Sequence, residues 1–214
     1  EETGEFHYFN VTNPAKFVKA IDEHYASDCA AKWQKESGAE VVLMQVLGST
    51  HSHFIYVGYK NNDMLEKGRQ LFRSCKESAK MIAKLNMYSE PSAYVSRLGE
   101  QSLEVGDWTT DNHFMKFDFN VALGKASVYA SEWTKMMNSL EQTNSAGLIT
   151  HRAGSGWISH FVYVGGNSID DLYSTFDANS QTDSFQNFAK NVSSIRELRN
   201  VSLLTPVKAY PSKR

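Results

Sequence analysis

The pattern of apolar and polar positions occurs twice along the chain. The alternating, β-branched stretch SHFIYVGYK begins at Ser52, and a near copy, SHFVYVGGN, begins at Ser159. Two further matches lie in the same order: FNV at residues 9 and 119, and YASD and YASE at residues 25 and 129. Three collinear matches indicate a tandem duplication in which each half forms one structural repeat.

Both halves predict the same order of elements from the period of their apolar residues. The first half predicts a strand from residue 7, a helix from Pro14, strands over 39–48 and 52–60, a helix over 64–85 and a strand over 92–98. The second half predicts a strand over 114–121, a helix around 129–140, strands over 148–154 and 159–167, a helix over 169–195 broken near Asn179, and a strand over 201–210. We expect Gly38 and Gly147 to end the first helix of each half. The order β-α-β-β-α-β is that of the ferredoxin-like unit.

The third strand of each half bears on how the sheets are covered. Residues 54–57 and 161–164 are apolar on both alternating faces, so neither face of the strand can be left to water. We therefore expect an α+β protein with two ferredoxin-like repeats, residues 1–99 and 113–214, whose sheets pack face to face. Residues 100–112 are expected to form the linker.

The element order and the apolar outer faces resemble the dimeric α+β barrel superfamily, here fused into a single-chain pseudo-dimer. This group includes antibiotic-biosynthesis monooxygenases, stress-responsive A/B barrel proteins and the haem-binding chlorite dismutases. The resemblance covers nearly the whole chain, and no motif assigns it to one member family. It implies a cavity between sheet and helices in each half, where relatives hold small, often aromatic molecules, some of which react without a metal or cofactor.

Composition narrows the partners. Hydrophobic residues make up 41% of the 214 residues, which is enough for a sizeable core. The net charge of -2, with basic and acidic residues interspersed, provides no basic stripe for nucleic acid. The longest apolar runs are far shorter than the roughly 18 to 20 residues that cross a bilayer. We expect a small-molecule ligand, no nucleic acid, no membrane, and a monomeric pseudo-dimer or a higher homo-oligomer.

Two features bear on location. The chain begins at Glu1 without an initiator Met, which fits either an exported protein after removal of a signal peptide or a trimmed chain. Cys29 and Cys75, 46 residues apart, fit either one disulfide between neighbouring helices or two buried thiols. We expect a periplasmic or secreted location, with a cytoplasmic one left open.

Three histidines are candidates for proton transfer, because the imidazole pKa lies near working pH. His53 and His160 take equivalent positions at the start of the third strand of each half. His24 falls near the sheet-facing stripe of the first helix, and the repeat places Val128 at the equivalent position. For each histidine the alternative is a structural imidazole held within the core.

Five aromatic residues are candidate ligand contacts, because the resemblance implies a cavity beside their helices and strands. They are Tyr25, Tyr56, Tyr129, Tyr163 and Trp133. Tyr25 and Tyr129 each precede a carboxylate by three residues, which places phenol and carboxylate on one helix face. The alternative is that these rings only pack in the core and that the carboxylates face solvent.

Metal and cofactor sites have little support. His51 and His53 lie on one strand face, but no cysteine or carboxylate at suitable spacing completes a ligand set. Haem has no support beyond a free histidine, and we expect neither metal nor cofactor. The sequence thus favours a small-molecule binding protein, or a cofactor-independent enzyme, acting on a largely apolar ligand. The alternative is a non-catalytic structural or interaction protein with filled cores. A cavity above about 300 Å³ lined by a histidine and one or two tyrosines favours the first.

Overall fold

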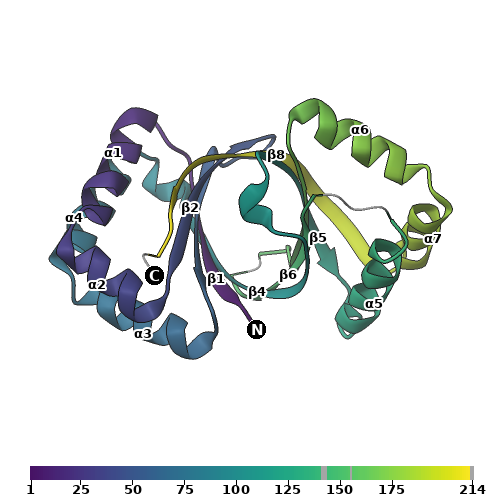
Figure 1. The fold of residues 1–214 in the computed structure, drawn as a ribbon, viewed down its shortest axis with the longest axis horizontal. Coiled ribbons are helices and arrows are strands. Elements are labelled where there is room, and N and C mark those ends of the chain that lie inside the picture. The colour runs from purple at the N-terminus through teal and green to yellow at the C-terminus, as the bar shows by residue number, and fades with distance from the viewer. Residues whose placement is uncertain (141–143, 155, 213–214) are drawn as a thin grey trace. The chain divides into compact units, whose positions relative to one another are not determined.

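The computed structural model describes residues 1–140, 144–154 and 156–212. The chain forms two compact units, which are coloured along the sequence in Figure 1. Unit 1 comprises Glu1–Glu100 and Pro206–Arg214, and unit 2 comprises Gln101–Thr205. The two boundaries fall inside strands, so residues 206–210 at the end of the last strand belong with the first half of the chain.

Unit 1 is a sheet with helices over one face (Figure 1). Its elements are β1 (Thr3–Phe9), α1 (Pro14–Tyr25), α2 (Asp28–Ser37), β2 (Glu40–Leu47), β3 (His53–Tyr59), α3 (Asn62–Arg73), α4 (Lys76–Met87) and the first part of β4 (Val95–Val105). A single 3-10 turn, Pro91–Ala93, precedes β4. All strand pairs are antiparallel: β1 lies between β3 and β4, and β2 pairs with the free side of β3.

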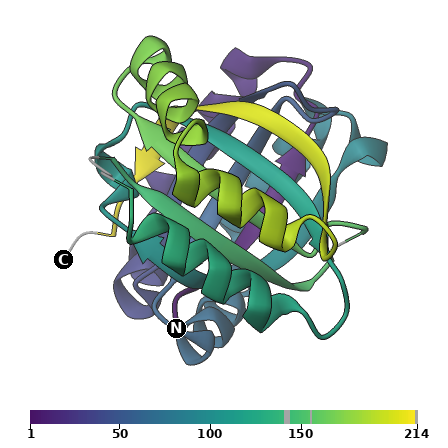
Figure 2. The ribbon, with the colours of Figure 1, turned by 90° about the vertical axis from the view of Figure 1, so that its right-hand side faces the viewer.

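Unit 2 repeats this arrangement (Figure 2). Its elements are β5 (His113–Val121), α5 (Ala126–Met137), β6 (Ala146–Ala153), β7 (His160–Gly166), α6 (Ile169–Ser180), α7 (Asp183–Val192) and most of β8 (Arg196–Tyr210). The pairing is again antiparallel, with β5 between β7 and β8 and with β6 beside β7. The α+β class is therefore confirmed, and the duplicated pattern corresponds to two sheets with the same strand order.

Local signals explain where the helices of unit 1 begin and end. The Asn13 side chain accepts a hydrogen bond from the backbone N–H of Lys16, and Pro14 takes the first helical position, as its fixed φ favours. Ser27 caps α2 in the same way. Gly38 ends α2 at a φ of 68°, in the left-handed region that glycine enters without a steric cost.

The helices differ from the sequence prediction in three respects. The helix predicted from Pro14 to Gly38 is two helices, α1 and α2, because Ser27 caps the start of α2. The helix predicted over 64–85 is two helices, α3 and α4, separated at Ser74 and Cys75, where Ser74 ends α3 and Cys75 caps α4. Gly147 does not end a helix: it lies inside β6, where the Tyr163 ring covers it so closely that a Cβ at this position would lie 2.4 Å from that ring. The small residue marks a close ring contact within the sheet.

The stretch predicted as a linker, residues 100–112, carries regular structure. Strand β4 continues to Val105, and Trp108–Thr110 form a short 3-10 helix. Asp111 is buried and accepts hydrogen bonds from the backbone N–H of Ser145 and the side chain of Asn144. This segment therefore contributes to the packing of unit 2.

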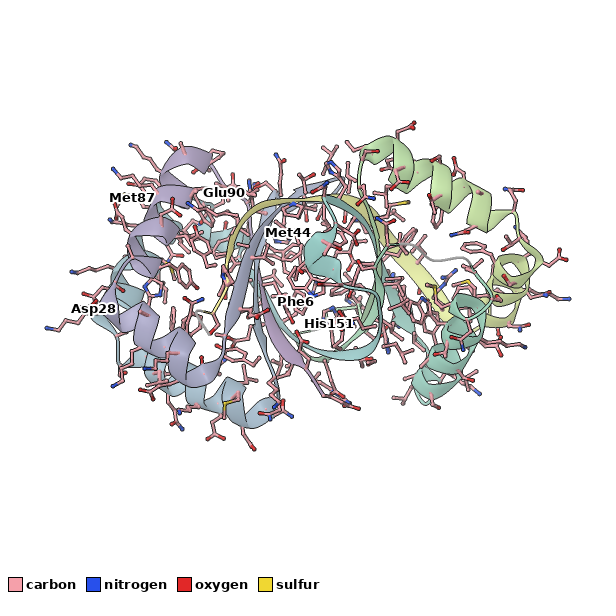
Figure 3. All side chains as sticks on the ribbon, viewed as in Figure 1. Phe6, Asp28, Met44, Met87, Glu90 and His151 are labelled. Atoms are coloured by element: carbon pink, nitrogen blue, oxygen red, sulfur yellow. A yellow bond between two sulfur atoms is a disulfide. The ribbon has the colours of Figure 1, made fainter. Side chains whose placement is uncertain are left out.

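Each sheet presents two different faces, as strand alternation requires. In unit 1, Phe9 and Ile55 pack with residues of the helices, whereas Phe6 and Met44 lie on the opposite face of the sheet (Figure 3). Both faces are buried, with Phe6 4% and Met44 5% exposed. Asp28 and Met87 lie on the outer side of the helical layer.

A disulfide joins Cys29 in α2 to Cys75 at the start of α4, with 6.0 Å between the two Cα atoms. This spacing lies within the usual range for a disulfide. Unit 2 contains no cysteine, so the crosslink constrains unit 1 alone. Among the described residues no helix is both long and apolar enough to cross a membrane.

Candidate functional site

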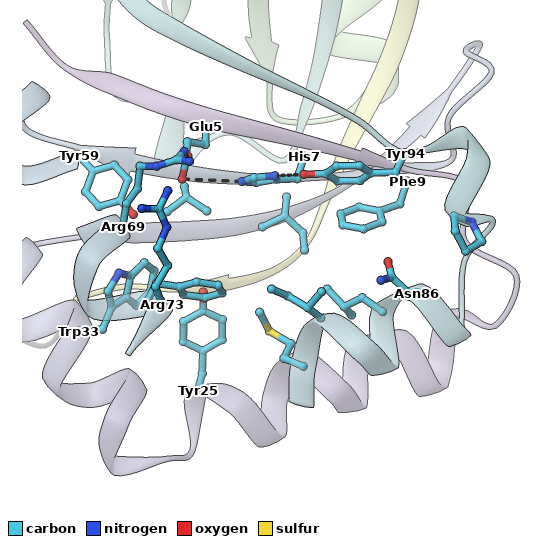
Figure 4. A pocket seen from close by; sticks show the side chains of 17 residues that line it. Glu5, His7, Phe9, Tyr25, Trp33, Tyr59, Arg69, Arg73, Asn86 and Tyr94 are labelled. Atoms are coloured by element: carbon cyan, nitrogen blue, oxygen red, sulfur yellow. Dashed lines mark hydrogen bonds and ion pairs between the residues drawn. The ribbon is translucent and has the colours of Figure 1, made fainter. Parts of the chain in front are cut away.

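A cavity of about 490 Å³ lies between the sheet and the helices of unit 1 (Figure 4). Its volume exceeds 300 Å³ and lies in the range typical of small-molecule sites. The walls are largely apolar and aromatic, with contributions from β1, β3 and the helical layer. They include Phe9, Ile55, Val57, Phe72, Met81 and Leu85.

The polar groups of the cavity lie in a row along β1. Glu5 and His7 alternate with Phe6 and therefore point to the helix-covered face. The Glu5 carboxylate lies 3.8 Å from His7 Nε2, and Tyr94 Oη lies 2.7 Å from His7 Nδ1. Tyr94 comes from the turn before β4, and its ring stacks on that of His7. Figure 4 shows this row running along the sheet side of the cavity.

Glu5 is ionised in this row. Burial works to raise the pKa of Glu5, but the neighbouring His7 imidazole and Arg69 guanidinium together outweigh burial, so the pKa lies below its ordinary value. Arg69, from α3, donates a charge-assisted hydrogen bond to Glu5 Oε1. The Glu5 carboxylate is thus held as an acceptor facing the imidazole.

The ionised Glu5 fixes the tautomer of His7. A carboxylate accepts only, so the neutral imidazole carries its proton on Nε2, which faces Glu5. His7 Nδ1 is then an acceptor, and Tyr94 donates its O–H to it. Burial raises the pKa of Tyr94, and a hydrogen bond with Ser96 offsets only part of this effect, so the phenol stays protonated at neutral pH. The row is therefore Glu5 carboxylate, Nε2–H imidazole and a phenol whose lone pairs remain available.

Three further aromatic residues line the cavity, Trp33 and Tyr25 from the helices and Tyr59 from the end of β3. Trp33 Nε1 donates to the carbonyl oxygen of Gly68 at 3.0 Å, and Tyr59 packs so closely on Gly68 that a Cβ there would lie 2.3 Å from the Tyr59 ring. Tyr25 stacks at 4.4 Å on Tyr210, which belongs to the part of β8 that lies in unit 1. Burial, followed by the neighbouring phenols of Tyr59 and Tyr210, raises the pKa of Tyr25. These phenols are neutral.

The structure does not bring the predicted histidines His53 and His160 to the cavity lining. Each takes an equivalent place in its unit, where Nδ1 lies 2.8 Å from Ser52 Oγ and 2.7 Å from Ser159 Oγ, respectively. Burial lowers the pKa of His53. Burial, and then the charge of Arg152, lowers the pKa of His160 to about 4. Both rings are neutral and buried at strand ends.

His24 is only 3% exposed and lies in α1 with its ring against Tyr25 and Phe72. Neither ring nitrogen has a hydrogen-bond partner of normal geometry among the described residues. Burial lowers the pKa of His24, and the nearby backbone and carboxylate of Glu77 offset part of that shift. His24 packs behind the wall of the cavity and does not line it.

Of the five aromatic candidates, Tyr25 lines the cavity. Tyr56 alternates with Ile55 and Val57 and therefore lies on the opposite face of the unit 1 sheet. Tyr163 takes the equivalent place in β7. Tyr129 and Trp133 are 1% and 2% exposed and belong to the packed cluster of unit 2, where the pKa of Tyr129 is raised to about 12 by burial.

The residues with the strongest chemistry, Glu5, His7 and Tyr94, were missed by the sequence prediction. A signal was present: EFHYF alternates charged or polar with aromatic residues, which is unusual for a strand with two buried faces. In β5, Met115 and Phe117 take the places of Glu5 and His7, since Phe9 matches Phe119.

Among the described residues, one group of three metal-ligand atoms lies close together, from Cys29, Cys75 and Glu77. Both sulfurs are held in the disulfide and are not thiolates, so this group lacks the donors that a zinc site needs.

Solved structures of similar fold match nearly the whole length of the chain. An anthrone oxidase-like protein matches with a TM-score of 0.69 at 11% identity, covering 100% of this chain and 94% of its own. A candidate monooxygenase from Lactobacillus acidophilus matches with a TM-score of 0.66 at 10% identity, covering 99% and 96%. A haem-binding protein from Thermus thermophilus matches with a TM-score of 0.53 at 9% identity, covering 97% and 93%.

These neighbours belong to the dimeric α+β barrel superfamily, and this chain has their fold. No protein-family model and no curated protein sequence matches the chain. At such low identity the likeness concerns the fold alone, so a function has to be argued from the cavity of unit 1.

Proposed function

We propose that unit 1 binds a small, largely apolar, hydroxylated molecule and removes a proton from its hydroxyl group. The observation that carries the proposal is the row of Glu5, His7 and Tyr94 along one wall of an apolar cavity of about 490 Å³. A concave apolar site with a few converging polar groups is the usual form of a small-molecule site.

The proton moves through Tyr94. The ligand hydroxyl donates a hydrogen bond to the phenol oxygen of Tyr94, whose own proton points to His7 Nδ1. As the ligand O–H bond breaks, Tyr94 accepts that proton and passes its own to Nδ1. The products are a ligand oxyanion and an imidazolium, and the Glu5 carboxylate beside Nε2 stabilises the imidazolium. Arg69 keeps Glu5 ionised and in place.

Haem does not fit this row. An axial ligand needs a ring nitrogen directed at open space. In His7, Nδ1 accepts from Tyr94 and Nε2 faces Glu5, so neither nitrogen is directed at the open cavity. The proposed proton transfer uses only side chains of this protein.

Naphthol provides the test, because its neutral and ionised forms differ in absorbance and fluorescence. We expect naphthol bound to the protein to ionise about tenfold more readily than free naphthol, a difference of about 1.4 kcal/mol. The substitutions His7→Gln and Tyr94→Phe should abolish this gain. His113→Gln is the matched control, because His113 contacts Thr205 in unit 2 and lies outside the cavity.

Two outcomes contradict the proposal. Naphthol that binds and ionises as it does in water would show that His7 is not a base for the ligand. Unchanged fluorescence of Trp33, a cavity residue, at saturating naphthol would show that the cavity does not bind such molecules.

We further propose that each unit is a ferredoxin-like repeat of one duplicated ancestor and that the chain acts as a single-chain pseudo-dimer. The equal strand order of the two sheets supports this proposal. The disulfide supports a periplasmic or secreted location, because such bonds persist in oxidising compartments. Alkylation of the native protein before and after reduction tests the disulfide on which this location depends. Thiols that react without reduction would contradict it.

A further inference from the structure

One cation at the cavity has no role in the row of Glu5, His7 and Tyr94. Arg73 lines the cavity from the last turn of α3, one turn after Arg69. Arg69 is paired with Glu5. Within the described parts of the chain, the guanidinium of Arg73 has neither an ion-pair nor a hydrogen-bond partner.

Arg73 is exposed to solvent and lines the cavity close to a second guanidinium, that of Arg69. Residues four apart share one helix face, and like charges at that spacing repel. Figure 4 shows Arg73 reaching from α3 toward the same end of the cavity as Arg69 and Glu5, while Tyr94 lies at the other end. A basic residue in the last turn of a helix does interact favourably with the helix dipole. That effect accounts for a positive charge at this position but not for its presence in the cavity lining.

The charge of the lining points to a monoanion. Glu5, Arg69 and Arg73 lie in this lining, and one carboxylate against two guanidiniums leaves a net charge of +1 from these three residues. A guanidinium matches a carboxylate through two parallel hydrogen bonds. A doubly charged group such as phosphate exceeds the available charge and is repelled by Glu5 nearby.

We propose that the ligand of unit 1 is a hydroxy acid with an apolar, ring-sized body, whose carboxylate pairs with Arg73 while its hydroxyl meets Tyr94. This inference rests on the proposed function, because it assigns the second end of the same ligand. The apolar body lies between the two ends, against residues such as Ile55, Val57 and Met81.

The anion site belongs to unit 1 alone. Helix α6 begins 107 positions after α3 (169 − 62), so Arg69 corresponds to Phe176 and Arg73 to Ser180. Phe176 stacks on Phe117, the counterpart of His7, at 5.3 Å. Unit 2 therefore has neither guanidinium where unit 1 has both.

A matched pair of probes tests the inference: hydroxynaphthoic acid and its primary amide, which have the same shape but differ in charge. Binding is followed by the fluorescence of the cavity residue Trp33 and by calorimetry. We expect the native protein to bind the acid about tenfold more tightly than the amide, and Arg73→Gln to remove this preference without weakening binding of the amide. Arg73→Lys should keep part of it, because the charge remains.

Lys67→Gln is the control on the same helix. Lys67 pairs with Glu36 and lies outside the cavity lining, so its substitution should leave the preference for the acid intact. Retention of the preference in Arg73→Gln, or equal binding of acid and amide by the native protein, would overturn the carboxylate assignment and leave the proposed function standing. Failure of both probes to bind would overturn the proposed function, and the assignment with it.

Discussion

The helix-covered faces of the two sheets are equivalent in the fold and opposite in character. In unit 1, β1 presents Glu5 and His7 to a cavity, and α3 adds Arg69. In unit 2, Met115, Phe117 and Phe176 take these positions, and the two phenylalanines stack on each other. The same backbone arrangement therefore supports a polar row in one unit and an aromatic contact in the other.

On the face turned away from the helices, the first strand of unit 1 is aromatic and the first strand of unit 2 is charged. Phe6 and Tyr8 of β1 correspond to Lys116 and Asp118 of β5, and the latter two form a buried ion pair. Each unit thus has charged or polar residues on one face of its first strand. In unit 1 this is the face covered by helices, and in unit 2 it is the other face. Since burying an unpaired charge is costly, each unit supplies the partners: Arg69 and His7 for Glu5, and Lys116 for Asp118. The two units therefore share a strand order and differ in where they bury polar residues.

The largest difference that experiment can expose between the units comes from the disulfide, which only unit 1 contains. Reduction of the Cys29–Cys75 bond should destabilise unit 1 by about 3 to 4 kcal/mol, because it releases a loop of 46 residues in the unfolded chain. Unit 2 should be unaffected. Urea unfolding with and without reductant measures this effect.

Unit 1 contains Trp33 and unit 2 contains Trp133, so single-tryptophan variants report the two transitions separately. Equal shifts of both transitions on reduction would show that the units unfold together and that the comparison does not extend to stability.

A smaller effect is expected from the equivalent histidines. Burial and Arg152 lower the pKa of His160 to about 4, whereas an unfolded histidine titrates near pH 6.5. A lowered folded-state pKa means that the unfolded state binds the proton more tightly. The stability is therefore full above about pH 6.5 and falls as the pH drops toward 4. The shift corresponds to about 3 kcal/mol, which solvent screening reduces to about 2 kcal/mol.

Unfolding free energies measured between pH 7 and pH 4 for His160→Gln and His53→Gln compare the two sites. We expect His160→Gln to flatten the dependence more strongly, because Arg152 adds to burial at His160 while burial is the only cause at His53. A stronger effect of His53→Gln would contradict this account.

The smallest effect on stability is expected when His7 of unit 1 is replaced by phenylalanine, the residue at the equivalent position 117 of unit 2. His7→Phe should change the free energy of unfolding by no more than about 1 kcal/mol, because loss of the Tyr94 hydrogen bond is offset by removal of a partly buried polar ring. The enhanced ionisation of naphthol should disappear. A variant that keeps this ionisation would separate His7 from the chemistry, and His113→Phe in unit 2 serves as the control.

The sequence predicted the element order because apolar periodicity and capping residues act locally. Asn13 and Pro14 begin α1 as expected, whereas Gly38 ends α2 and not the helix that begins at Pro14. The break between α3 and α4 at Ser74 and Cys75 was missed. The place of Gly147 inside β6 was also missed, since it depends on a contact with a residue of another strand, Tyr163, whose ring covers Gly147.

Of the residues that the sequence suggested for a site, Tyr25 lines the cavity of unit 1. The repeated SHF motif drew attention to His53 and His160, which lie at strand ends away from the cavity lining. A repeated motif contains the residues that have the same role in both units. Here that role is to hold the strand end: Ser52 accepts a hydrogen bond from the backbone N–H of Val11, and Ser159 accepts one from the backbone N–H of Val121. The residues that distinguish unit 1 are, for the same reason, absent from the repeat.

The sequence by itself determined the repeated apolar pattern of its two halves, the α+β class and the burial of both sheet faces, because these follow from periodicity and composition. Only the tertiary structure decided which polar groups meet. Glu5 and His7 share a strand, but Arg69, Arg73 and Tyr94 reach the cavity from elements that lie 60 to 90 positions further along the chain. Their contacts depend on strand pairing and helix packing, which no local pattern encodes.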